Sequence, residues 1–209
     1  MKKTLIFLGA PGSGKGTQSA KLVNDGYAHI STGNLLRAEI EKKSDLGNKI
    51  TEVMKSGNLV SDDIVCELLK SNLDLKNSIY IFDGYPRNIE QAESLDGILG
   101  DTEYLAVYLN LDTDKLISRL ANRRMTKDGK NIYNLDTKPP VVEGICDITG
   151  EDLIQREDDK ESVVRDRMGV FSDTISPVLR HYEKLNKLVT IQADQDMDSV
   201  YSEIVRKIK

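Results

Sequence analysis

The chain of 209 residues allows one large domain or two small ones, and its 39% hydrophobic content excludes a disordered or collagen-like protein. Its 29 basic and 34 acidic residues leave a net charge of −5, which argues against general binding to nucleic acid or to an anionic membrane. The two cysteines, Cys66 and Cys146, are too few for a zinc ribbon or a disulfide framework. They indicate reduced thiols in a cytoplasmic protein. No apolar run reaches the roughly 18 residues that a membrane span needs.

Short apolar runs of β-strand character alternate along the chain with amphipathic helical stretches, a pattern typical of a parallel sheet covered by helices. We expect strands at Thr4–Leu8, Ala28–Ile30, Ser78–Asp83, Tyr104–Leu109 and Leu188–Ile191. We expect helices at Lys15–Val23, Asn34–Lys42, Asp45–Lys55, Asp62–Asn72, Ile89–Leu99, Asp112–Asn122, Lys160–Leu185 and Met197–Ile208. The alternation predicts an α/β fold.

Two segments interrupt this alternation. Ser31–Val60 holds two predicted helices without a strand of its own. Met125–Asp158 is polar and rich in turns, and it shows no helical period. A stretch of that kind inside a compact domain is either disordered or a functional lid. Apolar residues punctuate it too often for a disordered tail, so we expect a small insert of short strands.

The segment Gly9–Thr17, Gly-Ala-Pro-Gly-Ser-Gly-Lys-Gly-Thr, follows an apolar strand and opens a helix. Its glycines let backbone N–H groups close around an anion, the helix N-terminus adds a partial positive charge, and Lys15 adds a full one. This context predicts a binding site for nucleotide phosphates. Gly16 occupies the position directly after the lysine, and the hydroxyl comes one residue later, at Thr17. The loop therefore lacks the usual direct magnesium ligand of a hydrolase.

Arginines gather near the candidate motifs, whereas the lysines are scattered along the chain. Eight of the ten arginines lie there, namely Arg37, Arg87, Arg119, Arg123, Arg124, Arg156, Arg165 and Arg167. Because arginine grips phosphate bidentately, the cluster predicts a site that holds several phosphates at once. Surface ion pairing is the alternative for any single arginine. His29 and His181 lie outside the motifs and are expected to be surface or paired structural residues.

Three motifs resemble the bacterial adenylate kinase family: Gly9–Thr17, then Ile30-Ser-Thr-Gly33 with Arg37, then Asp83-Gly-Tyr-Pro-Arg87 with Gln91. The later arginines, the lid-like insert and the run Arg156-Glu-Asp-Asp159 extend the resemblance over essentially the whole chain. It implies the fold of a P-loop nucleoside monophosphate kinase, with a five-stranded parallel sheet flanked by helices, an AMP-binding insert and a lid. The implied division is a core domain of 1–30, 61–121 and 160–209, an NMP-binding domain of 31–60 and a lid of 122–159.

The resemblance also implies the reaction ATP + AMP = 2 ADP, with Mg²⁺ that arrives with ATP. The implied partners are ATP, AMP and ADP, without nucleic acid or membrane, and the implied state is a cytoplasmic monomer. One alternative is another nucleoside monophosphate kinase, of the UMP/CMP type, with a different acceptor base. The other is a catalytically silent nucleotide sensor, against which the intact set of Lys15, Arg87, Arg123, Arg156 and Arg167 argues.

Site residues follow from the family positions. The implied catalytic residues are Lys15, Arg87, Arg123, Arg156, Arg167 and Asp83, with no metal bound directly by the protein because Asp83 acts through water. The implied ATP-binding residues are Gly12, Ser13, Gly14, Lys15, Gly16, Thr17, Arg119, Arg123, Ile132, Tyr133 and Gln195. The implied AMP-binding residues are Thr32, Gly33, Arg37, Asn58, Leu59, Val60, Gly84, Arg87, Gln91, Arg156 and Arg167.

Several of these positions also have simpler structural explanations. Asp83 could cap a strand end, and Gln91 could lie on a helix surface. Ile132 and Tyr133 could form the core of the lid. The family places Asp158 and Asp159 beside the donor nucleotide, but capping of the next helix explains at least one of them equally well.

The chain departs from the family pattern at three places. Asn34 replaces an aspartate, which predicts either a weaker hold on magnesium or a helix cap and nothing more. Gln195 stands where many relatives carry a lysine. The lid positions of the four-cysteine zinc set are Thr126, Gly129, Cys146 and Thr149, which cannot complete a tetrahedral site. We therefore expect no structural zinc and a lid held by hydrogen bonds through Thr126, Asp147 and Thr149.

Overall fold

A computed structural model describes residues 2–208 and contains a central sheet of five parallel strands in the order β2-β3-β1-β4-β7. The strands are β1 (Thr4–Leu8), β2 (Ala28–Ser31), β3 (Tyr80–Asp83), β4 (Tyr104–Asn110) and β7 (Leu188–Gln192). The predicted α/β class and five-stranded sheet are confirmed. β3 begins two residues later than predicted because its partner β2 begins at Ala28, which pairs with Tyr80.

Eight helices are described, and four of them, α1, α3, α5 and α8, have the predicted bounds. They are α1 (Lys15–Val23), α2 (Thr32–Glu41), α3 (Asp45–Lys55), α4 (Asp62–Lys70), α5 (Ile89–Leu99), α6 (Thr113–Ala121), α7 (Glu161–Lys184) and α8 (Met197–Ile208). The start of α2 differs from the prediction. Ser31 still pairs with Asp83 in the sheet and is the N-cap, so the helix follows the strand without a loop. The explanation of Asn34 as a helix cap is therefore wrong.

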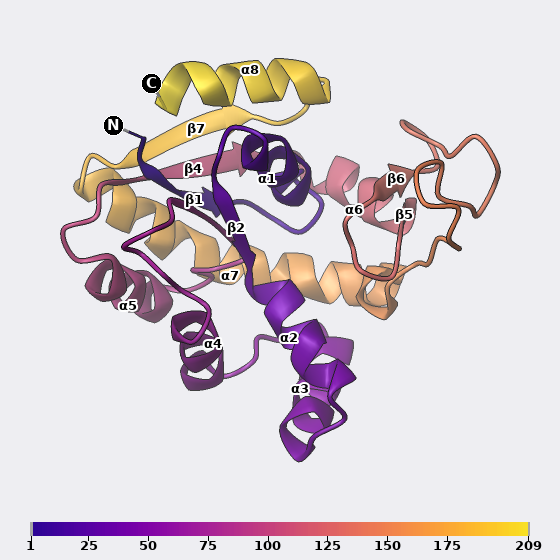
Figure 1. Cartoon of the computed structure of the whole chain (residues 1–209), viewed down its shortest axis with the longest axis horizontal. Coiled ribbons are helices and arrows are strands. Elements are labelled where there is room, and N and C mark those ends of the chain that lie inside the picture. Colours follow the sequence, from indigo (N-terminus) through magenta and orange to yellow (C-terminus); the bar gives the residue numbers. More distant parts are fainter. Residues whose placement is uncertain (1, 209) are drawn as a thin grey trace.

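The two faces of the sheet are covered by different helices (Figure 1). Side chains alternate along a strand, so Leu5 and Phe7 of β1 pack with residues of α1 and α8 on one face. Ile6 and Leu8 pack on the other face, against α4, α5 and α7. All four side chains are at most 2% exposed, as expected for a parallel strand covered on both sides.

The connections at the carboxyl ends of the strands carry the unusual segments. β1 leads into the glycine-rich loop before α1, and β3 ends at Asp83. α2 and α3 extend away from the sheet beyond the end of β2, and β5 (Arg123–Met125) and β6 (Ile132–Asn134) follow α6 (Figure 1). Ligands of open α/β sheets bind at this edge.

The insert after α6 consists of short antiparallel pairings, as predicted. β5 pairs with β6, and isolated bridges join Met125 to Ile154 and Ile145 to Asp152. The first bridge ties the later part of the insert back to its hairpin, and the second closes a loop within that later part. A short 3₁₀ helix, η1 (Glu157–Asp159), then leads into α7.

Hydrogen bonds of three polar side chains hold the turns of this insert. The buried Thr126 hydroxyl donates to Asp128 Oδ1 at 2.7 Å and accepts from the Asn131 N–H at 3.1 Å. Asp147 Oδ1 accepts from the Val141 N–H at 2.8 Å, and Thr149 donates to Glu151 at 3.0 Å. The predicted bonds through Thr126, Asp147 and Thr149 are confirmed.

No helix within residues 2–208 combines the length and the apolar character that crossing a membrane requires.

Candidate active site

The loop between β1 and α1 closes around the Lys15 ammonium group. Lys15 Nζ donates to the carbonyl oxygens of Gly9 and Ala10 at 2.7 and 2.9 Å. Gly12 has a φ of 85°, and a Cβ there would lie 3.0 Å from the Leu120 side chain, so the turn requires glycine. Gly14 is the N-cap of α1 and offers no side-chain oxygen to the first N–H groups of the helix. Those N–H groups are therefore available to an anion.

Asp83 lies among positive groups at the end of β3. Its carboxylate oxygen Oδ2 is 3.4 Å from Nε2 of His29, on the neighbouring strand β2. Burial raises the pKa of Asp83, but His29, Lys15 and Arg87 together outweigh burial and hold the pKa below its usual value. Asp83 is therefore an ionised carboxylate near neutral pH. His29, expected to be a surface or paired structural residue, instead borders this candidate catalytic acid.

The second histidine conforms to expectation. His181 Nε2 lies 2.6 Å from Asp96 Oδ2 on α5, far along the chain from the motifs. It is a paired structural residue.

The positively charged side chains around Asp83 are buried and repel one another. Burial, together with Arg87, Arg167 and Arg123 and against the opposing effect of Asp83, lowers the pKa of Lys15 to about 8. Burial and neighbouring arginines likewise lower the pKa of Arg87 to about 10 and that of Arg156 to about 9. Desolvated cations that repel one another are stabilised by added negative charge, so the cluster suits a multiply charged anion.

Two aspartates hold two of these arginines in place. Asp159 is fully buried and accepts from Arg123 Nε and Nη2 at 2.8 and 2.5 Å. Arg167 Nη1 donates to the Asp158 carbonyl at 2.6 Å and lies 3.0 Å from its carboxylate. The N-cap of α7 is Lys160, so the explanation of Asp158 or Asp159 as a helix cap is wrong.

Two other arginines of the cluster predicted from the sequence form surface or local contacts. Arg165 pairs with Glu161 at 2.8 Å, and both side chains are 63% exposed. Arg124 donates to the carbonyl oxygens of Ala121 and Arg123. These two arginines stabilise local structure.

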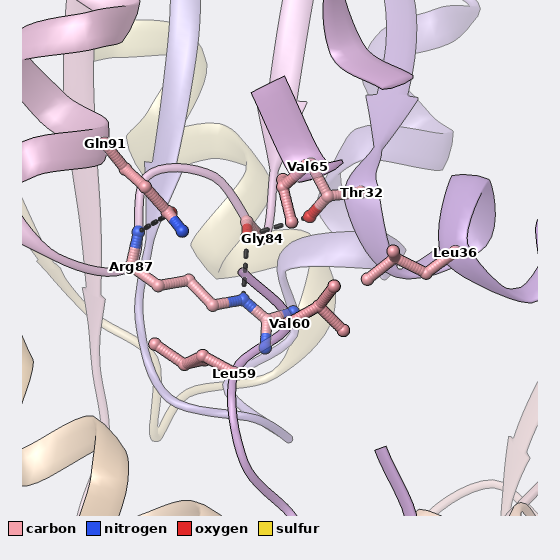
Figure 2. Close-up of a pocket in the computed structure, with 8 residues that line it drawn as sticks. All are labelled: Thr32, Leu36, Leu59, Val60, Val65, Gly84, Arg87 and Gln91. Atoms are coloured by element: carbon pink, nitrogen blue, oxygen red, sulfur yellow. Dashed lines mark hydrogen bonds between the residues drawn. The ribbon is translucent and has the colours of Figure 1, made fainter. Parts of the chain in front are cut away.

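A pocket lies between α2, α4, α5 and the segment after β3 (Figure 2). Its lining residues are Thr32, Leu36, Leu59, Val60, Val65, Gly84, Arg87 and Gln91. Thr32 Oγ1 and Arg87 Nε both donate to the Gly84 carbonyl at 2.8 Å, which joins the two walls. Gln91 is 2% exposed, so its explanation as a helix-surface residue is wrong.

Two lining residues, Leu36 and Val65, were missed by sequence reasoning. Leu36 lies four residues after Thr32, on the same face of α2, so helical spacing could have found it. Val65 is on α4, and nothing in the linear sequence places it beside Gly84.

Five predicted acceptor residues lie outside this lining, namely Gly33, Arg37, Asn58, Arg156 and Arg167. Arg37 Nη2 donates to Asn34 Oδ1 at 2.7 Å and stands 3.0 Å from the place of a Cβ on Gly33. Asn58 is exposed and donates to Ser56 Oγ at 3.1 Å. The Asn34 amide thus contacts Arg37.

The predicted donor-side residues are spread over α6, the insert and the segment after β7. Arg119 Nη1 donates to the Ala193 carbonyl at 3.2 Å. Gln195 is exposed and donates to the Gln192 carbonyl at 3.2 Å. Tyr133 is 4% exposed, and its hydroxyl accepts from the Asp147 N–H at 2.9 Å, which makes it part of the lid core. Ile132 is half-buried.

The insert lies against α2 at two points. A Cβ on Gly129 would stand 3.1 Å from Arg156 Nη2 and 4.0 Å from Asn34 Oδ1. Lys127 Nζ lies 4.0 Å from Glu41 Oε1. The two segments that interrupt the sequence pattern therefore lie close to each other beside Arg156.

Comparison with known proteins agrees with this arrangement. The family described as adenylate kinase matches residues 7–187. An adenylate kinase of Thermosipho melanesiensis is 44% identical over 98% of this chain and 99% of its own length. One of Hydrogenobaculum sp. is 41% identical over 96% and 97%, and an adenylate kinase 2 of Schistosoma mansoni is 39% identical over 98% and 88%. Because the family match spans most of the chain and these relatives align over nearly its whole length, the chain belongs to the adenylate kinase family.

Proposed function

We propose that the chain transfers a phosphoryl group from ATP to AMP, giving two ADP, between the loop around Lys15 and the pocket beside Arg87. Membership of the adenylate kinase family makes the chain a phosphotransferase. The observation that carries the proposed site is the cluster of desolvated cations, Lys15, Arg87, Arg123, Arg156 and Arg167, that surrounds the edge shared by loop and pocket.

ATP is proposed to bind with its phosphates in the glycine-rich loop. Backbone N–H groups of Gly12–Thr17 and the Lys15 ammonium group would hold them, with Arg123 beside them. The base would lie near Arg119, whose bond to the Ala193 carbonyl supports the segment that carries Gln195. Ile132 and Tyr133 would then cover the base through the lid, with Tyr133 acting as part of its core.

AMP is proposed to bind in the pocket beside Gly84. Arg37 and Arg87 would grip its phosphate, and Gln91 would hydrogen-bond the adenine edge. The apolar walls, which include Leu59 and Val60, would contact the base. Thr32, Gly33 and Asn58 would shape the entrance around Arg37.

Magnesium fits this site if the protein holds it through water. Asp83 and Thr17 offer the oxygen atoms that Mg²⁺ prefers. Because Gly16 has no side chain, space remains beside Asp83, where a Cβ would stand 3.7 Å from Oδ2. Within residues 2–208, no three His, Cys, Asp or Glu side chains gather into a metal-binding group, so the ion would arrive with ATP. When bound, the ion neutralises phosphate charge.

The arginines supply the main catalytic effect in this proposal. The acceptor is a phosphate oxygen that is ionised near neutral pH, so no general base is needed. Arg123, Arg156 and Arg167 would stabilise the charge that develops on the transferring group. Asp158 and Asp159 fix the direction of Arg123 and Arg167, which reduces the reorganisation required during transfer.

Movement of two segments would exclude water and prevent hydrolysis of ATP. We propose that 31–60 is the NMP-binding domain and 122–159 the lid, and that both move on a core of 1–30, 61–121 and 160–209. The proposed state of the protein is a monomer. Both cysteines are free, which supports a cytoplasmic location.

An acceptor screen tests the proposal. The purified protein, ATP and Mg²⁺ are incubated with AMP, UMP or CMP, and formation of nucleoside diphosphates is followed. We expect AMP to have the highest kcat/KM. Equal use of UMP or CMP would contradict the acceptor assignment and favour the UMP/CMP type of kinase. Binding of both nucleotides without any product would favour the silent sensor.

A further inference from the structure

We propose that Asp62 fixes the orientation of the Gln91 side-chain amide and thereby makes the acceptor site select adenine over hypoxanthine and guanine. The inference rests on the proposed contact between Gln91 and the acceptor base. Asp62 begins α4 and Gln91 lies in the first turn of α5, so two helices meet at this contact.

Both ends of the Gln91 amide are bound inside the protein. Its Nε2 donates to Asp62 Oδ1 at 2.6 Å. Its Oε1 accepts from the backbone N–H of Arg87 at 2.8 Å, the bond drawn in Figure 2. The side chain is 2% exposed, so water cannot replace either partner.

The two partners permit only one orientation of the amide. An ionised carboxylate accepts hydrogen bonds and cannot donate them, whereas a backbone N–H donates and cannot accept. Rotation of the amide by half a turn would place Oε1 against the Asp62 carboxylate and the amide hydrogens against the Arg87 N–H. Two attractive contacts would become two repulsive ones, so the flipped amide is strongly disfavoured.

Asp62 is itself held in position by Asn88. The Asn88 Nδ2 group donates to Asp62 Oδ2 at 3.0 Å and to Oδ1 at 3.3 Å. The Asn88 Oδ1 atom accepts from the Gln91 backbone N–H at 2.8 Å as the N-cap of α5. The carboxylate therefore cannot turn to follow a flipped Gln91 without losing its own partners.

An amide of fixed orientation distinguishes purines that a rotating amide accepts equally. Gln91 keeps one N–H and one oxygen lone pair beyond its internal bonds. Adenine presents an amino donor beside the N1 acceptor, which matches an oxygen and an N–H in that order. Hypoxanthine and guanine present the O6 acceptor beside the N1–H donor, which is the reverse order. They would leave buried polar groups unpaired, the situation that gives strong discrimination.

The test compares AMP, IMP and GMP as acceptors, with ATP as donor, in four proteins. In Asp62→Asn, the new amide can donate as well as accept, so one of the two contacts that disfavour the flipped Gln91 amide is removed and only the Arg87 N–H still opposes the flip. We expect the ratio of kcat/KM for AMP to that for IMP to fall at least tenfold, with the KM for ATP unchanged. The matched control Asp63→Asn removes the same charge from the next, exposed position of α4 and should keep the wild-type ratio. Gln91→Leu tests the base contact itself.

A second variant keeps the proposal testable if Asp62→Asn fails to fold. Asn88→Ser keeps an N-cap oxygen for α5 but removes both bonds to Asp62, and we expect a smaller fall in the same ratio. Calorimetric binding of AMP and IMP without ATP gives a measure that does not depend on turnover. If both variants keep the wild-type ratio while Gln91→Leu lowers it, Asp62 does not set the selectivity. If Gln91→Leu also keeps the ratio, the base contact in the proposed function is wrong.

Discussion

Lys15 illustrates how a side chain that we propose to bind phosphate can lower the stability of the folded protein. Its ammonium group is desolvated among arginines, and its pKa is lowered to about 8. Below this pH the folded protein must keep a charge that the unfolded chain solvates fully. The free energy of unfolding is therefore reduced at neutral pH, and this reduction disappears as the pH rises toward the ordinary lysine pKa of about 10.5.

We predict that Lys15→Met raises the free energy of unfolding of the nucleotide-free protein by about 1 kcal/mol at pH 7 and abolishes most phosphoryl transfer. The stabilisation should shrink between pH 8 and 10.5, where the wild-type lysine has lost its proton in the folded state but still holds it in the unfolded chain. Urea unfolding at several pH values measures this difference. Equal stabilisation at pH 7 and pH 11 would show that packing, not charge, is responsible.

The contact between Asn34 and Arg37 gives a second prediction. A neutral amide oxygen holds the guanidinium group at 2.7 Å without neutralising it. In Asn34→Asp, a carboxylate would compete with the AMP phosphate for Arg37, because it adds a Coulomb attraction to the guanidinium that the neutral amide lacks. We expect the KM for AMP to rise about fivefold, with the KM for ATP unchanged.

The sequence suggested another result for the same substitution. If Asn34 acts on hydrated magnesium, Asn34→Asp lowers the magnesium concentration needed for half-maximal activity and leaves AMP affinity nearly unchanged. A magnesium titration at saturating nucleotides, run beside an AMP titration at saturating magnesium, separates the two. If only the magnesium titration curve shifts and the AMP curve does not, residue 34 does not control how strongly Arg37 binds the AMP phosphate.

The lid insert is stabilised by polar side chains as well as by its hairpin. The buried residues Thr126, Tyr133 and Cys146 occupy its interior, and Tyr133 OH lies 3.5 Å from Cys146 Sγ. Burial opposes a lower pKa of Cys146, but bonds from Thr149 and Tyr133 outweigh it and lower the pKa to about 7. A buried hydrogen-bonded network of this kind resists local opening because each unpaired partner costs about 1–3 kcal/mol.

This network gives a prediction about metal removal. We expect the purified protein to contain less than one zinc per chain and to keep its melting temperature when a chelator is added without nucleotide. Activity should still stop, because the magnesium that accompanies ATP is removed. Elemental analysis and thermal unfolding provide the two measurements. One tightly bound zinc per chain would contradict a lid stabilised by hydrogen bonds.

The whole molecule concentrates positive charge at one edge although its net charge is −5. The cations come from the loop after β1, the segment after β3, the insert and α7, and Asp83, Asp158 and Asp159 compensate them in part. A multiply charged anion would therefore bind the folded state alone and stabilise it.

We predict that inorganic tripolyphosphate without magnesium raises the melting temperature by several degrees and that added salt weakens the effect. Arg167→Gln should reduce the rise, whereas Arg165→Gln should not, because Arg165 pairs with Glu161 on the surface. Differential scanning fluorimetry over a range of salt concentrations is sufficient. An equal rise in the two variants would mean that the anion binds elsewhere.

Local patterns in the sequence were sufficient to predict most helices and strands and the phosphate-binding loop. The helix α1 and the strand β1 have the predicted bounds, because apolar periodicity and the glycine-rich turn between them act over a few residues. The turn residues and scattered apolar residues of the insert predicted short strands there, although they did not give the bounds of those strands.

The contacts between distant segments required the folded chain. Asp62 and Gln91 are 29 residues apart, His29 and Asp83 are 54 apart, and Arg123 and Asp159 are 36 apart, yet each pair is in contact. Sheet order and helix packing bring these side chains together, and neither leaves a period in the sequence. Residue type and motif spacing thus predicted which side chains are candidates for the chemistry, whereas packing determined which partners contact and orient these side chains.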